Sequence, residues 1–124
     1  ELLDDGCNVI IFPEGTRTTR HGKNSYKKGA ARIALKAGAN VQPILIAGSD
    51  KYSLGKHDPW WSYNHVEHLL YHFIMLPQID ISEYKDLSEA IAAKRLTEKM
   101  EEVIVTAGNS YNENHPLCKT VNNI

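Results

Sequence analysis

The sequence passes from an apolar run to a charged turn within ten residues, Asn8-Val9-Ile10-Ile11-Phe12-Pro13-Glu14-Gly15-Thr16-Arg17. The β-branched run 8–12 is typical of a strand that is covered on both faces. Pro13 lacks the amide hydrogen that a continuing ladder needs, so the strand is predicted to end there. The four residues that follow would lie at the carboxyl end of the strand, where α/β proteins hold ligands. We therefore expect a ligand site at residues 14–17.

The region after this turn predicts a second strand and a helix that joins the two strands. Residues 27–37 are typical of a helix that Gly38 ends, and their alanines would pack closely on a sheet. Residues 41–46 form another apolar run, in which Pro43 indicates an edge strand or an early strand position. This order predicts a βαβ unit with a right-handed crossover. We expect an α/β fold with a mixed, mostly buried sheet flanked by helices.

The second half of the chain predicts one more strand and a long helix. The strand is expected within residues 71–76. Asp86 and Glu89 resemble a capping box, which would open a helix that runs to about Ala107. The apolar positions of this helix form an inward stripe, made of Leu96, Met100, Val103 and Ala107.

We expect residues 1–107 to be the C-terminal portion of a single domain and residues 108–124 to be a flexible polar tail. Residues 1–6 are typical of the end of a helix with Gly6 as its stop. No initiator Met or signal-peptide pattern is present, so an N-terminal truncation is expected.

Positive charge is concentrated in one part of the chain. The 124 residues carry 14 Lys and Arg and 15 Asp and Glu, which gives a formal net charge of −1. Seven of the cations lie in a stretch without acids, namely Arg17, Arg20, Lys23, Lys27, Lys28, Arg32 and Lys36. Lys28, Arg32 and Lys36 are four residues apart and would form a basic stripe on the helix. This stripe is either a solvated helix face or a surface for anionic lipid heads or carrier phosphates.

Cysteine content and apolar residues bear on the compartment and on membrane contact. Two cysteines do not make a disulfide framework and favour a reducing compartment; Cys7 is expected to be a buried thiol and Cys118 a tail residue. No stretch reaches the eighteen or so apolar residues of a membrane span. Trp60 and Trp61 are expected to be half-buried in a long connection rather than to lie at a membrane interface.

The residue types at positions 14–17 favour an anionic substrate that also carries a hydroxyl group. Arg17 can bind a phosphate through two parallel hydrogen bonds. Gly15 allows a close approach of the backbone, and Thr16 adds a hydroxyl. Glu14 would be repelled by phosphate, so it would orient Arg17 or accept a bond from a substrate hydroxyl. This set fits a phosphorylated polyol better than a nucleotide.

Residues 12–17 resemble the third signature block of the glycerolipid acyltransferases, the family that includes 1-acylglycerol-3-phosphate acyltransferases. Residues 41–46 are similar to the fourth block, and the intervening Lys27-Lys28-Gly29-Ala30-Ala31 is also typical. The resemblance covers roughly the first half of the chain. It implies a glycerol-3-phosphate acyltransferase-like fold and a substrate site made of Glu14, Gly15, Thr16, Arg17, Lys28 and Pro43.

The resemblance also implies a reaction and a location. The family transfers a fatty acyl group from acyl-CoA or acyl carrier protein to the free hydroxyl of a lysophospholipid, in phospholipid biosynthesis. The thioester is a co-substrate, and no cofactor or metal is implied. We expect peripheral attachment to the cytoplasmic face of the cell membrane, and no nucleic-acid partner.

The chain lacks the catalytic base that the resemblance implies. In the family a His is followed five positions later by an Asp. Here the residues at that distance from the six histidines are Tyr26, Ser62, Leu70, Phe73, Pro77 and Thr120. We therefore assign no catalytic residue to this chain and expect it to be inactive alone, supplying the phosphate-binding part.

Two other interpretations remain open at the sequence level. The chain could be a non-catalytic anion-binding module for nucleic acid or lipid head groups, using the basic stretch together with Tyr26. His65, His68 and His72 could bind a metal, but their spacing matches no standard zinc pattern, and this interpretation is disfavoured.

Overall fold

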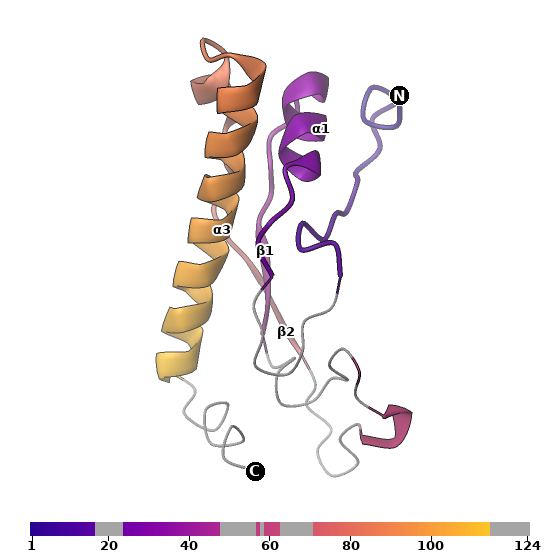
Figure 1. Cartoon of the computed structure of the whole chain (residues 1–124), viewed down its shortest axis with the longest axis vertical. Coiled ribbons are helices and arrows are strands. Elements are labelled where there is room, and N and C mark those ends of the chain that lie inside the picture. The colour runs from indigo at the N-terminus through magenta and orange to yellow at the C-terminus, as the bar shows by residue number, and fades with distance from the viewer. Residues whose placement is uncertain (17–23, 48–56, 58, 63–70, 115–124) are drawn as a thin grey trace.

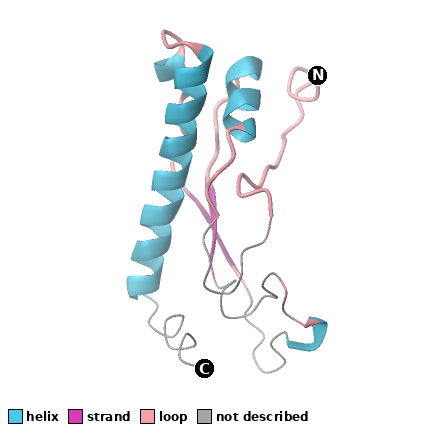
Figure 2. Ribbon diagram, viewed as in Figure 1, coloured by secondary structure: helices cyan, strands magenta, loops and turns pink. Residues whose placement is uncertain are grey.

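The computed structural model describes residues 1–16, 24–47, 57, 59–62 and 71–114. A long helix and a short helix lie side by side, and two strands cross next to them (Figures 1 and 2). The elements in chain order are α1 (Gly29–Ala37), β1 (Ile44–Ala47), the 3₁₀ helix η1 (Trp60–Ser62), β2 (His72–Met75), the 3₁₀ helix η2 (Ile81–Tyr84) and α3 (Glu89–Asn114).

Helix α1 ends as the sequence predicts, at a left-handed glycine. Gly38 has φ of 65°, a conformation that costs glycine little. Its amide donates to the Leu35 carbonyl at 3.3 Å, and the Ala39 amide donates to the Ala34 carbonyl at 3.0 Å. This pair of bonds is the Schellman arrangement, which satisfies carbonyls that the helix end leaves open. The predicted helix is confirmed, although it begins two residues later than expected.

Helix α3 is longer than the sequence predicts. It begins at Glu89, with the Ala92 amide donating to the Ser88 carbonyl at 2.8 Å, so Asp86 lies outside the helix and is not its cap. The predicted end at Ala107 is wrong, because the helix continues to Asn114. The first seven residues of the predicted polar tail are therefore helical, and residues 115–124 lie outside the described part of the chain.

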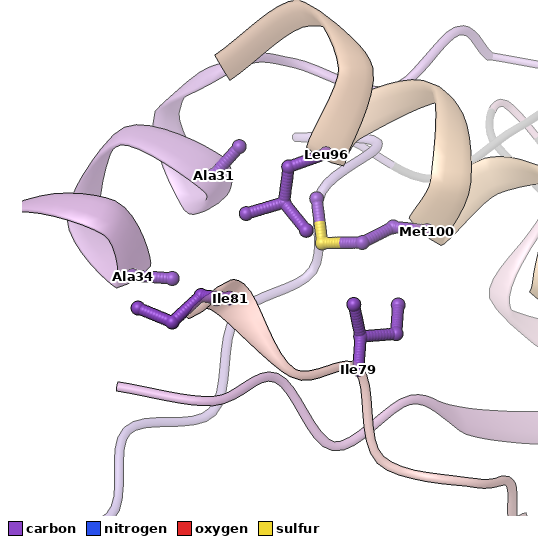
Figure 3. Close-up of a cluster of buried hydrophobic side chains, with 6 residues drawn as sticks. All are labelled: Ala31, Ala34, Ile79, Ile81, Leu96 and Met100. Atoms are coloured by element: carbon purple, nitrogen blue, oxygen red, sulfur yellow. The ribbon is translucent and has the colours of Figure 1, made fainter. Parts of the chain in front are cut away.

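The core lies where α1, α3 and η2 meet (Figure 3). Its buried side chains are Ala31, Ala34, Ile79, Ile81, Leu96 and Met100. Leu96 is fully buried, and Val103 and Ala107 are half-buried, which confirms the predicted inward stripe of α3. The small residues of α1 allow close packing, but they pack chiefly on α3 and not on a sheet as predicted.

The two described strands form an antiparallel pair. Ile44 lies opposite Met75, and Ile46 lies opposite Phe73. The strand predicted within residues 71–76 is thus confirmed as β2. The predicted βαβ unit is wrong for the described residues, because the partner of β1 follows it in the chain and runs in the opposite direction.

Only one face of this sheet is covered. Leu45 and Ala47 point toward the interior on the side where β1 contacts α3, and both are buried. On the opposite face Phe73 and Met75 are 68% and 70% exposed, with Ile44 beside them. The α/β character is therefore present, but the described sheet is half-covered and not mostly buried as predicted.

Residues 8–12 are not a strand, which overturns the first sequence expectation. They follow an extended path without ladder bonds to any described residue, and Ile10 and Phe12 are 82% and 66% exposed. A strand needs a neighbour that accepts its backbone hydrogen bonds, and the described residues provide none here.

The first seven residues give one confirmation and one correction. Gly6 has φ of 79°, with the Gly6 amide bonded to Leu3 and the Cys7 amide bonded to Leu2, as at the end of a helix. The predicted left-handed glycine is confirmed, although residues 2–6 form a turn and not a helix. Cys7, expected to be buried, is exposed, because the segment that follows it is not packed into a sheet.

Candidate functional site

Residues 12–16 form a tight turn held to the start of α1. The Gly15 amide donates to the Phe12 carbonyl at 3.1 Å, and Gly15 has φ of 74°. The Lys27 amide donates to the Pro13 carbonyl at 2.7 Å, and the Asn24 side-chain amide donates to the Thr16 carbonyl at 3.1 Å. The last two bonds join Pro13 to Lys27 and Thr16 to Asn24, so the turn lies next to the first residues of α1.

Three of the six predicted site residues lie in the turn, and a fourth, Lys28, directly follows the residue that is hydrogen-bonded to the turn. Gly15 and Thr16 are exposed, Glu14 is half-buried, and Lys28 is exposed at the N-cap position of α1. Arg17 lies outside the described residues. The turn therefore presents a backbone accessible to a ligand, with a carboxylate and lysine side chains around it.

The electrostatics of this corner favour an anion. The first turn of α1 contains no acid, and Lys27 and Lys28 stand at its N-terminal end. The amino end of a helix carries a partial positive charge from its unpaired amides, which adds to the charge of the lysines. The Glu14 carboxylate opposes this charge, as does the Glu101 carboxylate near Tyr26.

Tyr26 links the turn to α3. Burial of its hydroxyl raises the pKa of Tyr26 to about 12, and the carboxylates of Glu14 and Glu101 add to the increase. The Tyr26 side chain is half-buried and packs against the core cluster. A contact of Tyr26 with the turn was not predicted from the sequence. The one available signal for it was the presence of an aromatic residue just before the start of the helix.

The backbone hydrogen bond of Pro43 joins it to the residue after β2 and not to the turn. Pro43 is buried directly before β1, and its carbonyl accepts a bond from the Leu76 amide at 3.0 Å. This bond aligns β1 with β2, which agrees with the predicted early strand position. Its predicted place in the substrate region stays a prediction.

Two other groups singled out in the sequence have different environments from those expected. Trp60 and Trp61 form an edge-to-face pair with ring centroids 5.8 Å apart, and they are 74% and 63% exposed. The expectation of half-buried packing is therefore wrong. The Tyr111 hydroxyl lies 2.6 Å from His72 Nδ1, a hydrogen bond that joins β2 to the end of α3. His65 and His68 lie outside the described residues.

A cavity among the described residues lies away from the turn. This shallow cavity of about 370 Å³ lies between η2 and α3, and its lining includes both acids and bases but no residue of the turn. The described residues contain no group of three or more His, Cys, Asp or Glu that could hold a metal ion. Within the same residues, no helix is both long and apolar enough to cross a membrane.

Comparison with known proteins identifies the family. The Acyltransferase family matches residues 1–47, a range that contains all six predicted site residues. A chloroplastic 1-acyl-sn-glycerol-3-phosphate acyltransferase of Arabidopsis thaliana is 47% identical over 51 residues, which cover 41% of this chain and 14% of the relative. The 1-acyl-sn-glycerol-3-phosphate acyltransferases of Salmonella typhimurium and Escherichia coli are each 34% identical over 88 residues, or 69% of this chain and 32% of the relative.

The chain thus spans a third or less of the length of these relatives. No solved structure matches it. The match nevertheless begins at the first residue and includes the turn, α1 and β1. Residues 1–47 therefore belong to the Acyltransferase family, and the chain is homologous, over part of its length, to 1-acyl-sn-glycerol-3-phosphate acyltransferases.

Proposed function

We propose that this chain supplies the glycerol-phosphate-binding part of an enzyme that acylates 1-acylglycerol-3-phosphate. The observation that carries the proposal is the open turn at residues 12–16, fixed by the Pro13–Lys27 hydrogen bond beside the cations of α1. The names of the relatives, which describe this acceptor, support it.

The residues of the turn, Arg17 and Lys28 would each make a different contact with the substrate. Arg17 would hold the phosphate through two hydrogen bonds, and Lys28 would add a second positive charge. Thr16 and the backbone at Gly15 would contact the glycerol phosphate, while Glu14 would orient Arg17 or accept a bond from a hydroxyl. Pro43 and its neighbours would border the acyl region.

The reaction itself needs a base that this sequence does not contain. The free hydroxyl of the acceptor attacks the thioester carbonyl of acyl-CoA or acyl carrier protein, a C–O ester bond forms, and the C–S bond breaks to release the thiol. The hydroxyl proton passes to a base, and no His in the chain has an Asp five positions later. A general base contributes about 10²–10⁴ in rate. Purified chain is therefore expected to show no acyl transfer in a radiolabelled acyl-CoA assay, and measurable product would refute this.

The proposal extends to the fold and location of the complete enzyme. This enzyme would have a larger mixed sheet flanked by helices, as the family resemblance implies. The enzyme would act peripherally at the cytoplasmic face of the cell membrane, where its lipid substrates lie.

The second candidate, a nucleic-acid-binding module, is less well supported. That interpretation used the basic stretch together with Tyr26, but the Tyr26 side chain is half-buried and packs against the core cluster. Base stacking requires an accessible aromatic face. The basic stretch alone would give only salt-dependent binding without chemical selectivity.

Calorimetric titration of the chain with monomeric lysophosphatidate tests the proposal. Arg17→Ala is expected to weaken binding by about tenfold or more, since a hydrogen bond to a charged group contributes roughly 1.5–3 kcal/mol. Arg95→Ala removes an exposed arginine from α3 and serves as the matched control, with no expected change. Equal effects of the two substitutions, or no lysophosphatidate binding by the parent chain, would contradict the proposal.

A further inference from the structure

The solvent face of α1 carries a row of unpaired cations. Lys28, Arg32 and Lys36 are all exposed, and their spacing of four residues places them along one side of the helix over about 12 Å. Helix α1 itself contains no acid. Among the described residues no carboxylate lies within ion-pair distance of these three side chains. Their charge is therefore available to an external partner.

An apolar side chain borders this face. Ile33 is 48% exposed and lies three residues before Lys36, at the edge of the row of cations and away from the buried Ala31. The exposed apolar segment 9–12 ends at the same corner, because the Pro13–Lys27 hydrogen bond holds it to the start of α1. The surface thus combines cations with exposed aliphatic and aromatic side chains.

We propose that this surface, the basic face of α1 (Lys28, Arg32, Ile33 and Lys36), docks the protein on an anionic phospholipid bilayer. Cations attract the lipid head groups, and apolar side chains between them enter the boundary below, which is the combination that interfacial helices use. A nucleic acid or an acidic protein would use the charge but leave Ile33 and residues 9–12 in water. The choice of a bilayer also rests on the proposed function, since the acceptor is a lipid.

Vesicle sedimentation of the whole chain, without lysophosphatidate or acyl donor, tests this proposal. The vesicles are phosphatidylcholine alone, or phosphatidylcholine mixed with phosphatidylglycerol, in about 0.1 M salt. Each cation near an anionic surface contributes about fivefold to partitioning, so Arg32→Gln/Lys36→Gln is expected to lower binding to the mixed vesicles on the order of 30-fold. Binding to phosphatidylcholine alone is expected to be weak for every variant.

The matched control is Arg95→Gln/Lys99→Gln on α3. It removes the same charges at the same spacing from an exposed helix face, where Lys99 already lies 3.9 Å from Glu102. It is expected to leave partitioning nearly unchanged. The charge-preserving swap Arg32→Lys/Lys36→Arg is expected to bind as the parent does, which separates loss of charge from loss of folding.

Three outcomes would overturn the proposal. They are equal losses in the two charge-removing variants, no binding of the parent to the mixed vesicles, and equally tight binding of a short duplex DNA at the same salt concentration. If the chain binds the mixed vesicles but does not bind lysophosphatidate in the titration, the proposed function is rejected and the assignment of this surface stands.

Discussion

Gly15 is the residue on which the geometry of the candidate site depends most. Its φ of 74° is accessible to glycine but strained for residues with a Cβ. A Cβ at this position would meet the Lys27 side chain, whose Cγ lies at an ordinary contact distance of 3.7 Å, so backbone strain and not crowding sets the cost. Gly15→Ala is expected to lower the free energy of unfolding by about 1–2 kcal/mol in urea titrations and to weaken lysophosphatidate binding.

Gly29 is the control position for Gly15, because an added methyl group is expected to have the opposite effect on stability there. It lies in α1 with open space where a Cβ would be, and its φ is not positive. Gly29→Ala is expected to raise the free energy of unfolding by up to about 1 kcal/mol, because alanine favours the helix. A Gly15→Ala variant as stable as the parent would contradict the left-handed turn.

Tyr26 predicts a specific alkaline pH dependence. Its pKa is about 12 in the folded chain because of burial and the nearby carboxylates, and about 10 when exposed. The folded state therefore keeps the proton while the unfolded state releases it. The Tyr26 contribution to stability is expected to be constant below pH 10 and to fall between about pH 10 and 12. Tyr26→Phe should remove this part of the fall in denaturation curves, and an identical fall in that variant would be evidence against the assignment.

At the scale of elements, the contact between α1 and α3 holds the described structure together. Leu96 is fully buried in this contact, while Ile91 on the same helix is 48% exposed. Leu96→Ala is expected to lower the free energy of unfolding by about 2–5 kcal/mol, through lost burial and a cavity. Ile91→Ala is expected to change it by less than about 1 kcal/mol. Similar losses for both substitutions in urea titrations would mean that this contact is not the core.

The elements that the sequence predicts correctly are those whose signals are local. Helix α1 has a stripe of small residues and a glycine stop, and β2 is a short apolar run. The extension of α3 past Ala107 depends on tertiary contacts instead. Gly108 lies against Leu45 of β1, and Tyr111 bonds to His72 of β2, so packing overrides the low helix propensity of glycine.

The strand predicted at residues 8–12 is wrong for a related reason. Strand formation depends on a partner elsewhere in the fold, and composition alone does not show whether one is present. In the candidate site, positions 14–16 were predicted from their chemistry and Lys28 from the family resemblance. The Pro13–Lys27 hydrogen bond and the burial of Tyr26 could not be, because they depend on how the segment returns to the turn.

The whole molecule exposes an apolar sheet face that predicts association. Ile44, Phe73 and Met75 form this face together, and contiguous apolar surface favours contact with other apolar surface. The chain is expected to self-associate at high concentration in sedimentation-velocity runs, and Phe73→Glu/Met75→Lys should shift it toward monomer. Ile91→Glu/Val105→Lys, at separate exposed positions of α3, should not. A parent chain that stays monomeric throughout would contradict this expectation.

The central claim is that the turn at residues 12–16, together with the following Arg17, binds glycerol phosphate, and an amide NMR titration with sn-glycerol 3-phosphate tests it most directly. The account predicts that the Gly15 and Thr16 signals shift in a saturable way, that the Lys28 signal moves with them, and that Arg17→Ala raises the ligand concentration at half-saturation by about tenfold or more. Signals on α3 at Arg95 should stay in place. Shifts that are absent at the turn, or that saturate at the same concentration in Arg17→Ala, would contradict the claim.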